Sequence, residues 1–101
     1  MNDMLQVEIH EFAALEFDQA IDWYELQADG LGQRFKSHVN DQVKKIQCHP
    51  DWFPREDTSI YKAYIPKFPY KILFSFNKST IIIWAISHLH RKPWHWKTRI
   101  N

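Results

Sequence analysis

The chain of 101 residues contains one cysteine, Cys48, and only two glycines. A single thiol excludes an internal disulfide and a zinc site built from four cysteines, which favours a reducing compartment. No apolar run approaches the roughly 20 residues that cross a bilayer. Glu8, Glu11 and Glu16 also interrupt any candidate signal segment near the start. We therefore expect a cytoplasmic protein with no membrane partner.

Acidic residues are absent from the stretch Thr58 to Asn101, because Asp57 is the last of the twelve acids. Residues 1–50 carry nine acids against four bases, whereas residues 51–101 carry three acids against nine bases. This asymmetry indicates a surface for a polyanion or for an acidic protein segment. An equally weighted alternative is that the two halves interleave in space and neutralise each other.

Large apolar side chains are plentiful. Hydrophobic residues make up 45% of the chain and aromatic residues 16%. Each aromatic ring removes about 150–250 Å² from water when it is buried. This composition excludes a disordered chain, and at this length it predicts a single domain over residues 1–101.

The hydrophobic periodicity changes along the chain from helical to strand-like. Two segments repeat apolar residues every three or four positions, and Gly30 and Pro50 are expected to end them. The expected strands and helices cover residues 5–9, 13–28, 31–46, 60–65, 70–76 and 80–87. This β-α-α-β-β-β order predicts an α+β fold with a helical hairpin on one face of a small, mostly antiparallel sheet. Leu73 is expected at an exposed edge.

The segment 88–99 follows the last predicted strand and is rich in histidines, bases and indoles. Loops beyond strand ends commonly carry function, because a rigid sheet holds their groups in place. One hypothesis is a metal site made of His88, His90 and His95. No Asp or Glu accompanies these histidines in the acid-free stretch to support such a site. We therefore expect neither a metal nor a cofactor.

A second hypothesis is acid and base catalysis on RNA. Cleavage through the 2′-hydroxyl requires a proton acceptor and donor, together with positive charge on the phosphate, and it needs no metal. His88 or His90 would transfer the proton, since histidine titrates in the required pH range. The cations available for the phosphate are Lys62, Lys67, Lys71 and Arg91.

A third hypothesis treats the same segment as a binding surface. Indoles supply contact area and cations steer a charged partner towards it. The contrasting interpretation is that the tryptophans belong to the core and the cations only keep a tail soluble. The residues concerned are Arg91, Trp94, Trp96, Lys97 and Arg99.

Five segments, in order along nearly the whole chain, carry one further pattern. They are residues 20–25 (AIDWYE), 30–35 (GLGQRF), Ile46 with Pro50 and Phe53-Pro54, 67–72 (KFPYKI), and 88–93 (HLHRKP) followed by Trp96 and Arg99. Together they resemble the RelE/ParE toxin superfamily, on its ParE-like "plasmid stabilisation" side. The resemblance implies a bacterial cytoplasmic toxin that a cognate antitoxin protein wraps around and neutralises.

Two modes of toxicity are implied by the resemblance. RelE-like members cut messenger RNA on the ribosome without a metal, whereas ParE-like members poison DNA gyrase and are not nucleases. Nuclease members typically carry a C-terminal tyrosine, and the last tyrosine here is Tyr70. Tyr61-Lys62 stands where the family commonly has an arginine. Lysine cannot make the paired hydrogen bonds with which the arginine guanidinium binds a phosphate. Both departures favour a ParE-like, non-catalytic growth inhibitor.

Two alternatives stay open. One is a metal-independent mRNA endonuclease with His88, Arg91 and Lys71 as catalytic residues, and the other is an inactive homologue that only binds a partner. In every case the surface for the target or antitoxin is expected to include Lys62, Lys67, Lys71, Arg91, Trp96 and Arg99.

Overall fold

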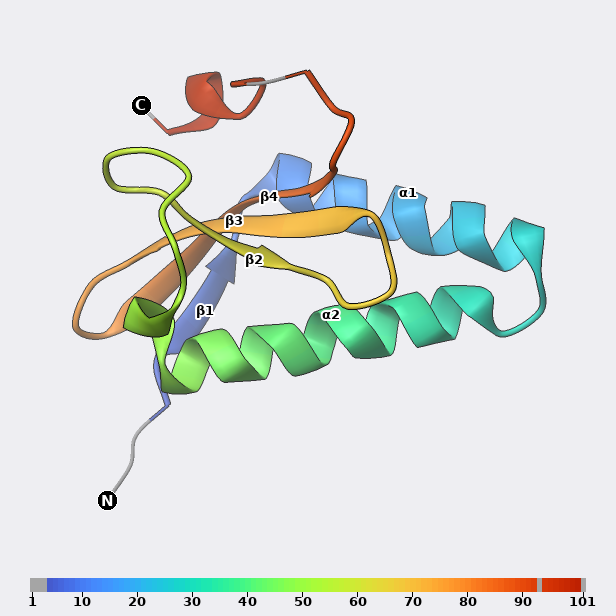
Figure 1. Ribbon diagram of the computed structural model, residues 1–101, viewed down its shortest axis with the longest axis horizontal. Coiled ribbons are helices and arrows are strands. Elements are labelled where there is room, and N and C mark those ends of the chain that lie inside the picture. Colours follow the sequence, from blue (N-terminus) through green and yellow to red (C-terminus); the bar gives the residue numbers. More distant parts are fainter. Residues whose placement is uncertain (1–3, 93, 101) are drawn as a thin grey trace.

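Two helices cover one face of a four-stranded sheet in the computed structural model (Figure 1). The expected β-α-α-β-β-β order and the α+β fold class are confirmed. The elements are β1 (Gln6–Ile9), α1 (Glu11–Gln27), α2 (Leu31–Cys48), the 3-10 turn η1 (Pro50–Trp52), β2 (Tyr61–Tyr64), β3 (Tyr70–Phe76), β4 (Thr80–His88) and the 3-10 turn η2 (Lys97–Arg99).

The structure describes residues 4–92 and 94–100. Pro93 of the basic motif and Asn101 at the end of the acid-free stretch lie outside these ranges. Within them, neither helix combines the length and the apolar character that crossing a bilayer requires.

The strands lie in the order β1-β4-β3-β2. The pairs β2–β3 and β3–β4 are antiparallel, whereas β1 runs parallel to β4, from which both helices, β2 and β3 separate it in the chain. β4 therefore has a strand on each side. Its continuous apolar run predicts this inner position, since only a strand covered on both faces can bury such a sequence.

The main core lies between the helices and the sheet. Burial of each large apolar side chain there contributes about 1.5–3 kcal/mol relative to exposure. Its fully buried members come from both layers: Phe35, Val39, Ile46, Ile72, Phe74 and Ile81. A second, smaller cluster lies on the opposite face of the sheet and consists of Ile60, Leu73, Ala85 and Trp96. The expectation that Leu73 is exposed is wrong, because residues beyond β4 fold back over that face.

A β-bulge in β4 decides which residues face which core. Leu73 pairs with Ala85 and Phe74 pairs with Ile83, so that Trp84 is an extra residue in the strand. Before the bulge Ile83 faces the helices, and after it Ile86 does. Bulges re-aim the side chains that follow them. Here the bulge places the side chain of the last residue of β4, His88, beside the ring of Tyr70.

The turn between the helices is stabilised by a carboxylate from α1. Glu25 accepts hydrogen bonds from the backbone N–H groups of Gly30 at 2.9 Å and Gly32 at 3.0 Å. These donors at the start of α2 have no helical partner, and a negative charge there also favours the helix dipole. Gly30 has a φ of 84° and begins α2 rather than ending α1, whose C-cap is Ala28.

Gly32 is expected to be the position in this turn that least tolerates a side chain. A Cβ there would lie 2.6 Å from the backbone oxygen of Ile21, so Gly32→Ala must separate the two helices. We expect the free energy of unfolding to fall by about 1–3 kcal/mol, measured by urea denaturation. Gln33→Ala, at an exposed position one residue later, should change it by less than about 0.5 kcal/mol. Equal stability of the two variants would contradict the close packing described here.

Candidate functional site

The chain beyond β4 folds back across the face of the sheet that the helices leave open. Trp96 is 3% exposed and packs against Ile60, Leu73 and Ala85. It is therefore a core residue, in contrast to the surface position expected from the sequence. Trp94 is half exposed, and its ring lies 4.4 Å from the Lys97 ammonium. The segment thus carries one buried indole that anchors it and one outward indole.

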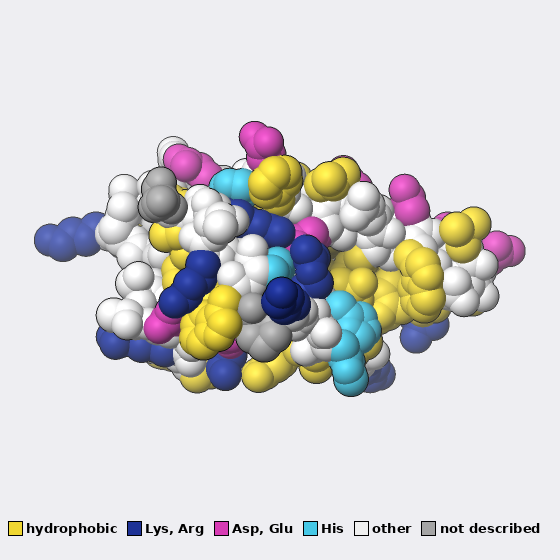
Figure 2. Space-filling model, turned by 90° about the horizontal axis from the view of Figure 1, so that it is seen from above, with side chains coloured by type: hydrophobic (Ala, Val, Ile, Leu, Met, Phe, Trp, Pro, Cys, Tyr) yellow, Lys and Arg dark blue, Asp and Glu magenta, His cyan; other side chains and the backbone are white. Residues whose placement is uncertain are grey.

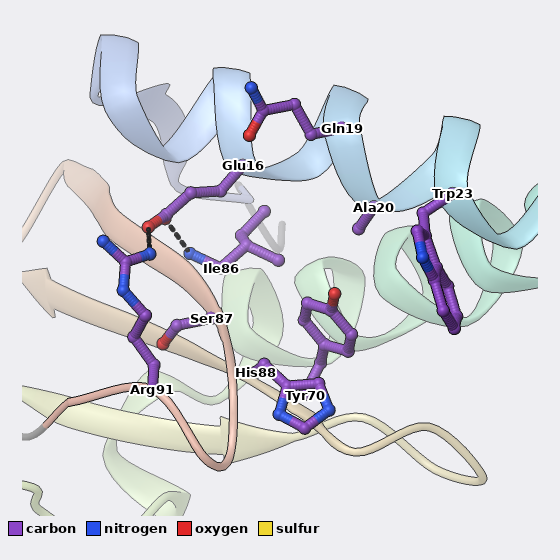
Figure 3. A pocket seen from close by; sticks show the side chains of 9 residues that line it. All are labelled: Glu16, Gln19, Ala20, Trp23, Tyr70, Ile86, Ser87, His88 and Arg91. Atoms are coloured by element: carbon purple, nitrogen blue, oxygen red, sulfur yellow. Dashed lines mark hydrogen bonds and ion pairs between the residues drawn. The ribbon is translucent and has the colours of Figure 1, made fainter.

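A single carboxylate on α1 holds this segment in place (Figure 3). Glu16 receives two parallel hydrogen bonds from the Arg99 guanidinium, at 3.0 and 2.8 Å. Arg91 donates to it at 3.2 Å, and the backbone N–H of Ile86 in β4 donates at 3.0 Å. Charge-assisted, bidentate pairs of this kind are among the stronger polar contacts in proteins. Glu16 consequently joins α1, β4 and the C-terminal segment.

Arg99 and Arg91 differ in what they can reach. The Arg99 side chain is only 7% exposed and also donates to the backbone oxygen of Trp84 at 2.9 Å. Arg91 is 49% exposed, so part of its guanidinium remains available to a partner. Arg99 is therefore a positioning residue, whereas Arg91 stays partly exposed.

A second carboxylate holds the cations of the strands. Glu56 pairs with Lys71 at 3.1 Å and with Lys62 at 3.7 Å. Nearby, Asp57 pairs with Lys97 at 3.3 Å, and the N–H of Thr58 and the Lys97 ammonium lower the pKa of Asp57. Glu56 and Asp57 belong to the same half of the sequence as Lys62, Lys71 and Lys97. The pairing between the two halves that the alternative describes is instead that of Glu16 with Arg91 and Arg99. The three lysines are nevertheless all paired. They do not form an uncompensated positive surface.

Lys67 stands apart from both groups of ion pairs. It lies exposed in the tight turn between β2 and β3, with a φ of 69° that non-glycine residues rarely adopt. Pro66 precedes it at a position that favours such a turn, in which the N–H of Phe68 bonds the oxygen of Ile65. Lys67 is therefore exposed, and its expected role in binding a target or antitoxin stays a proposal.

His88 lies at the edge of a cleft of about 260 Å³ beneath α1. Its ring contacts the Tyr70 ring edge-on, with centroids 5.2 Å apart, and Figure 3 shows the Tyr70 hydroxyl pointing towards α1. Burial and, secondarily, the Glu16 charge raise the pKa of Tyr70. The Nδ1 atom of His88 accepts the backbone N–H of His90, which leaves Nε2 to carry the proton of the neutral ring. The sequence analysis did not identify Tyr70 as a partner of His88.

Lys71, His88 and Arg91, the three expected catalytic residues, do line one common cavity, but it measures only about 20 Å³. A single water needs roughly 10–15 Å³ of such space, so a phosphate does not fit between them in this conformation. Ser87 and His95 also line this cavity, and their Oγ and Nε2 atoms are buried without a hydrogen-bond partner among the described residues.

His95 lies beside the Glu16 carboxylate without a properly directed hydrogen bond. Its Nε2 is 3.5 Å from Glu16, while Nδ1 lies 3.1 Å from the backbone oxygen of Lys92. Burial lowers the pKa of His95, and the charges of Arg91 and Arg99 add to this effect. The Lys92 oxygen and Glu16 act in the opposite direction but are outweighed. Because its pKa is lowered, the His95 ring is neutral at neutral pH. The 3.5 Å distance between its Nε2 and Glu16 is therefore a contact between a polar ring and a charge, and not an ion pair.

No three His, Cys, Asp or Glu side chains gather as a metal site would require, within the residues that the structure describes. His88 and His90 are neighbours, whereas His95 faces Glu16. His90 also lies beyond the end of β4, so it does not share a strand face with His88 as the metal hypothesis assumed.

The face seen in Figure 2 brings these features together. Lys and Arg side chains gather near its centre, with histidines and an apolar area beside them. On α1, four large apolar side chains outside its core positions are exposed: Phe12, Leu15, Trp23 and Leu26 are 50%, 51%, 56% and 83% exposed. α1 is thus apolar on two sides, only one of which packs against the sheet.

Comparisons with known proteins identify a relative of this architecture. No protein-family model matches the chain, and no curated protein does. Among solved structures, a chain of the chromosomal ParDE toxin–antitoxin system from P. aeruginosa is similar, with a TM-score of 0.67 and 21% sequence identity. The match covers 84% of this chain and 96% of that chain. The chain has a ParE-like fold.

The ParE-like fold confirms the architecture that the resemblance to the RelE/ParE superfamily implies. The sequence analysis overlooked Glu16, which holds the C-terminal segment within that fold. A signal was present, because Glu16 lies beside Ala13, Phe17 and Ala20 on the core side of a helix. A carboxylate at such a position requires a buried partner.

Glu16→Gln should separate the C-terminal segment from α1. Glutamine keeps an acceptor for the Ile86 N–H but leaves Arg91 and Arg99 without a negative charge. We expect the free energy of unfolding to fall by about 3 kcal/mol, measured by urea denaturation. Asp18→Asn, which removes an exposed carboxylate from the same helix, is the matched control and should change it by less than about 0.5 kcal/mol. If Glu16→Gln and Asp18→Asn have the same free energy of unfolding, the ion pairs of Glu16 make no net contribution to stability.

His95 should make stability depend on pH below neutrality. Because its pKa is lowered in the folded chain, the unfolded chain binds a proton more readily between the folded-state pKa and the ordinary value of 6.5. The free energy of unfolding should therefore decrease as the pH falls from 7.5 through 6.5 towards the folded-state pKa. His95→Gln should flatten this decrease, whereas His90→Gln, at an exposed ring, should keep it. Parallel stability curves for the wild type and His95→Gln would rule out the assignment.

Proposed function

We propose that the chain is the toxin of a type II toxin–antitoxin system, a cytoplasmic growth inhibitor that a protein antitoxin neutralises. The observation that carries this proposal is the ParE-like fold, which spans nearly the whole of the related ParDE chain. The five ordered segments that resemble the RelE/ParE superfamily support it independently, because they were identified from residues alone.

Within this proposal, inhibition is non-catalytic and DNA gyrase is the target. The cations that a nuclease would place on the scissile phosphate are engaged instead, Lys71 by Glu56 and Arg91 by Glu16. The space that they share with His88 is also too small for a phosphate. The choice of gyrase rests on the ParE-like resemblance. The exposed Lys67 and Arg91 are the expected contacts, together with Lys62 and Lys71.

The antitoxin is proposed to cover the outward side of α1. Three adjoining depressions of about 290, 260 and 360 Å³ follow this helix from Phe12 to Trp23. Exposed apolar side chains at helical spacing are the receptor surface that an amphipathic helix needs. Arg91 borders two of these depressions and would attract an acidic residue of the antitoxin. Trp96 and Arg99 would act indirectly, by holding the segment that carries Arg91.

One observation favours a ribonuclease as the second candidate. Tyr70 and His88 are paired across β3 and β4 and line the same cleft, with Arg91 at its edge. A tyrosine and a histidine could together move the protons that cleavage through the 2′-hydroxyl requires. Such a mechanism would use this cleft of about 260 Å³, and not the cavity of about 20 Å³ that Lys71 lines.

Expression of the chain alone in bacteria distinguishes these functions. We expect growth arrest, covalent gyrase–DNA complexes and intact messenger RNA, assayed by complex trapping and by mapping RNA ends. His88→Ala should leave the arrest unchanged, because the proposed mode involves no proton transfer. Arg91→Ala should weaken it. Coexpression with the protein encoded next to this chain should restore growth if that protein is the antitoxin.

Ribosome-dependent cuts that disappear in His88→Ala would replace the gyrase proposal with the ribonuclease. Unaffected growth, with the chain shown to be folded and abundant, would contradict the toxin proposal and favour a homologue that only binds a partner.

A further inference from the structure

A second apolar depression lies at the end of α2, and none of its lining residues lines the clefts beside Arg91. It encloses about 440 Å³, enough for a large side chain of a partner. Its walls come from the last turn of α2 and from η1. They consist of Lys44, Lys45, Cys48, His49, Trp52 and Phe53.

Trp52 projects from this site in a fixed orientation. The residue is 73% exposed, more than Trp23 or Trp94. Its ring stacks on the His49 imidazole with centroids 3.6 Å apart and an angle of 3° between the planes. The 3-10 turn beneath it begins at the buried Pro50, and the Trp52 N–H bonds the His49 oxygen at 3.1 Å. An indole held in this way loses little conformational entropy on binding, which is typical of an interface anchor.

The charge beside Trp52 indicates the chemistry of the occupant. Lys44 and Lys45 border the depression, and no carboxylate of residues 4–92 or 94–100 lies within 4.0 Å of either ammonium. They differ in this respect from Lys62, Lys71 and Lys97, which are paired. Two cations that have no carboxylate partner in the described part of the chain lie beside an apolar depression. They are complementary to a segment that combines carboxylates with one large apolar side chain.

We propose that this depression, the Trp52 site, binds an acidic peptide segment of a partner protein. One apolar side chain of the segment enters between Phe53 and Trp52, and neighbouring carboxylates contact Lys44 and Lys45. The site is independent of the proposed toxin function, since it uses other residues on another part of the chain. It gives the protein a second binding surface in addition to the clefts beside Arg91. One partner can use both surfaces, or two partners can use one each.

A single-stranded nucleic acid is the less suitable occupant. Such strands require a track of cations along the backbone together with aromatic faces for successive bases. Here one face of Trp52 is already occupied by His49, so it is not free for a base to stack on. The two lysines are adjacent on one helix and do not continue as a track.

Titration of the folded chain with three probes tests the proposal. The first is a ten-residue peptide of Asp and Glu with one central Phe, the second carries Lys in place of the acids, and the third is a ten-nucleotide oligouridylate. Nuclear magnetic resonance would follow the Trp52 indole N–H and the backbone of α2. We expect the acidic peptide alone to shift these signals. Trp52→Ala and the pair Lys44→Glu and Lys45→Glu should each weaken its binding about tenfold or more, as for an interface anchor.

Two matched variants control for general effects. Trp23→Ala removes an exposed indole from α1, and Lys36→Glu reverses an exposed charge elsewhere on α2. Both should bind the acidic peptide as the wild type does. Thermal unfolding would confirm that the Trp52 variant is folded, as the exposure of that side chain predicts.

The proposal is overturned if the basic peptide binds equally well, if the acidic peptide shifts α1 instead, or if none of the probes moves the Trp52 signal. Binding of the oligouridylate at Trp52 without binding of the peptide would assign the site to nucleic acid. None of these results depends on toxicity, so they leave the gyrase and ribonuclease experiments unaffected.

Discussion

The Glu16 carboxylate is the contact on which the arrangement of the C-terminal half depends. It binds Arg91, Arg99 and the backbone of β4 from a position on α1, some 70 residues or more earlier in the chain. A carboxylate that is 12% exposed requires such partners, because an unpaired charge there would be costly. The cluster holds Trp96 over the second face of the sheet, and Trp96 in turn covers Leu73. One ion-pair cluster therefore decides which surface the protein presents.

Because of such ion pairs, the bases of the acid-free stretch, residues 58–101, do not all contribute to an exposed positive surface. These bases form two classes: those held by Glu16, Glu56 and Asp57, and those that remain exposed, such as Lys67 and part of Arg91. Paired cations shape the fold, while exposed ones can steer a partner. The compensation explains why the ParE-like fold here offers little free charge for holding an RNA phosphate. It agrees with the proposal that inhibition depends on protein contacts.

The order of elements and both helices were predictable, because hydrophobic periodicity is a local property of the sequence. The strand 70–76 was predicted at its observed bounds, and β4 only one residue short. Leu73 was misplaced because period-two alternation assigns one face of a strand to solvent. This alternation carries no information about a later segment that folds back to cover that face. Glu16, Tyr70 and Ser87 were missed because each gains its neighbours from a distant part of the chain.

The sequence by itself determined the fold class and the positions of the turns, since periodicity, Gly30 and Pro50 act within a few residues. It also located the basic and aromatic segment after β4. Only the tertiary structure decided which of those residues face a partner. The bulge at Trp84 turns His88 towards Tyr70, and Glu16 withdraws Arg99 from the surface while leaving Arg91 half exposed. Charge and packing between distant residues decide exposure, and residue type alone does not encode it.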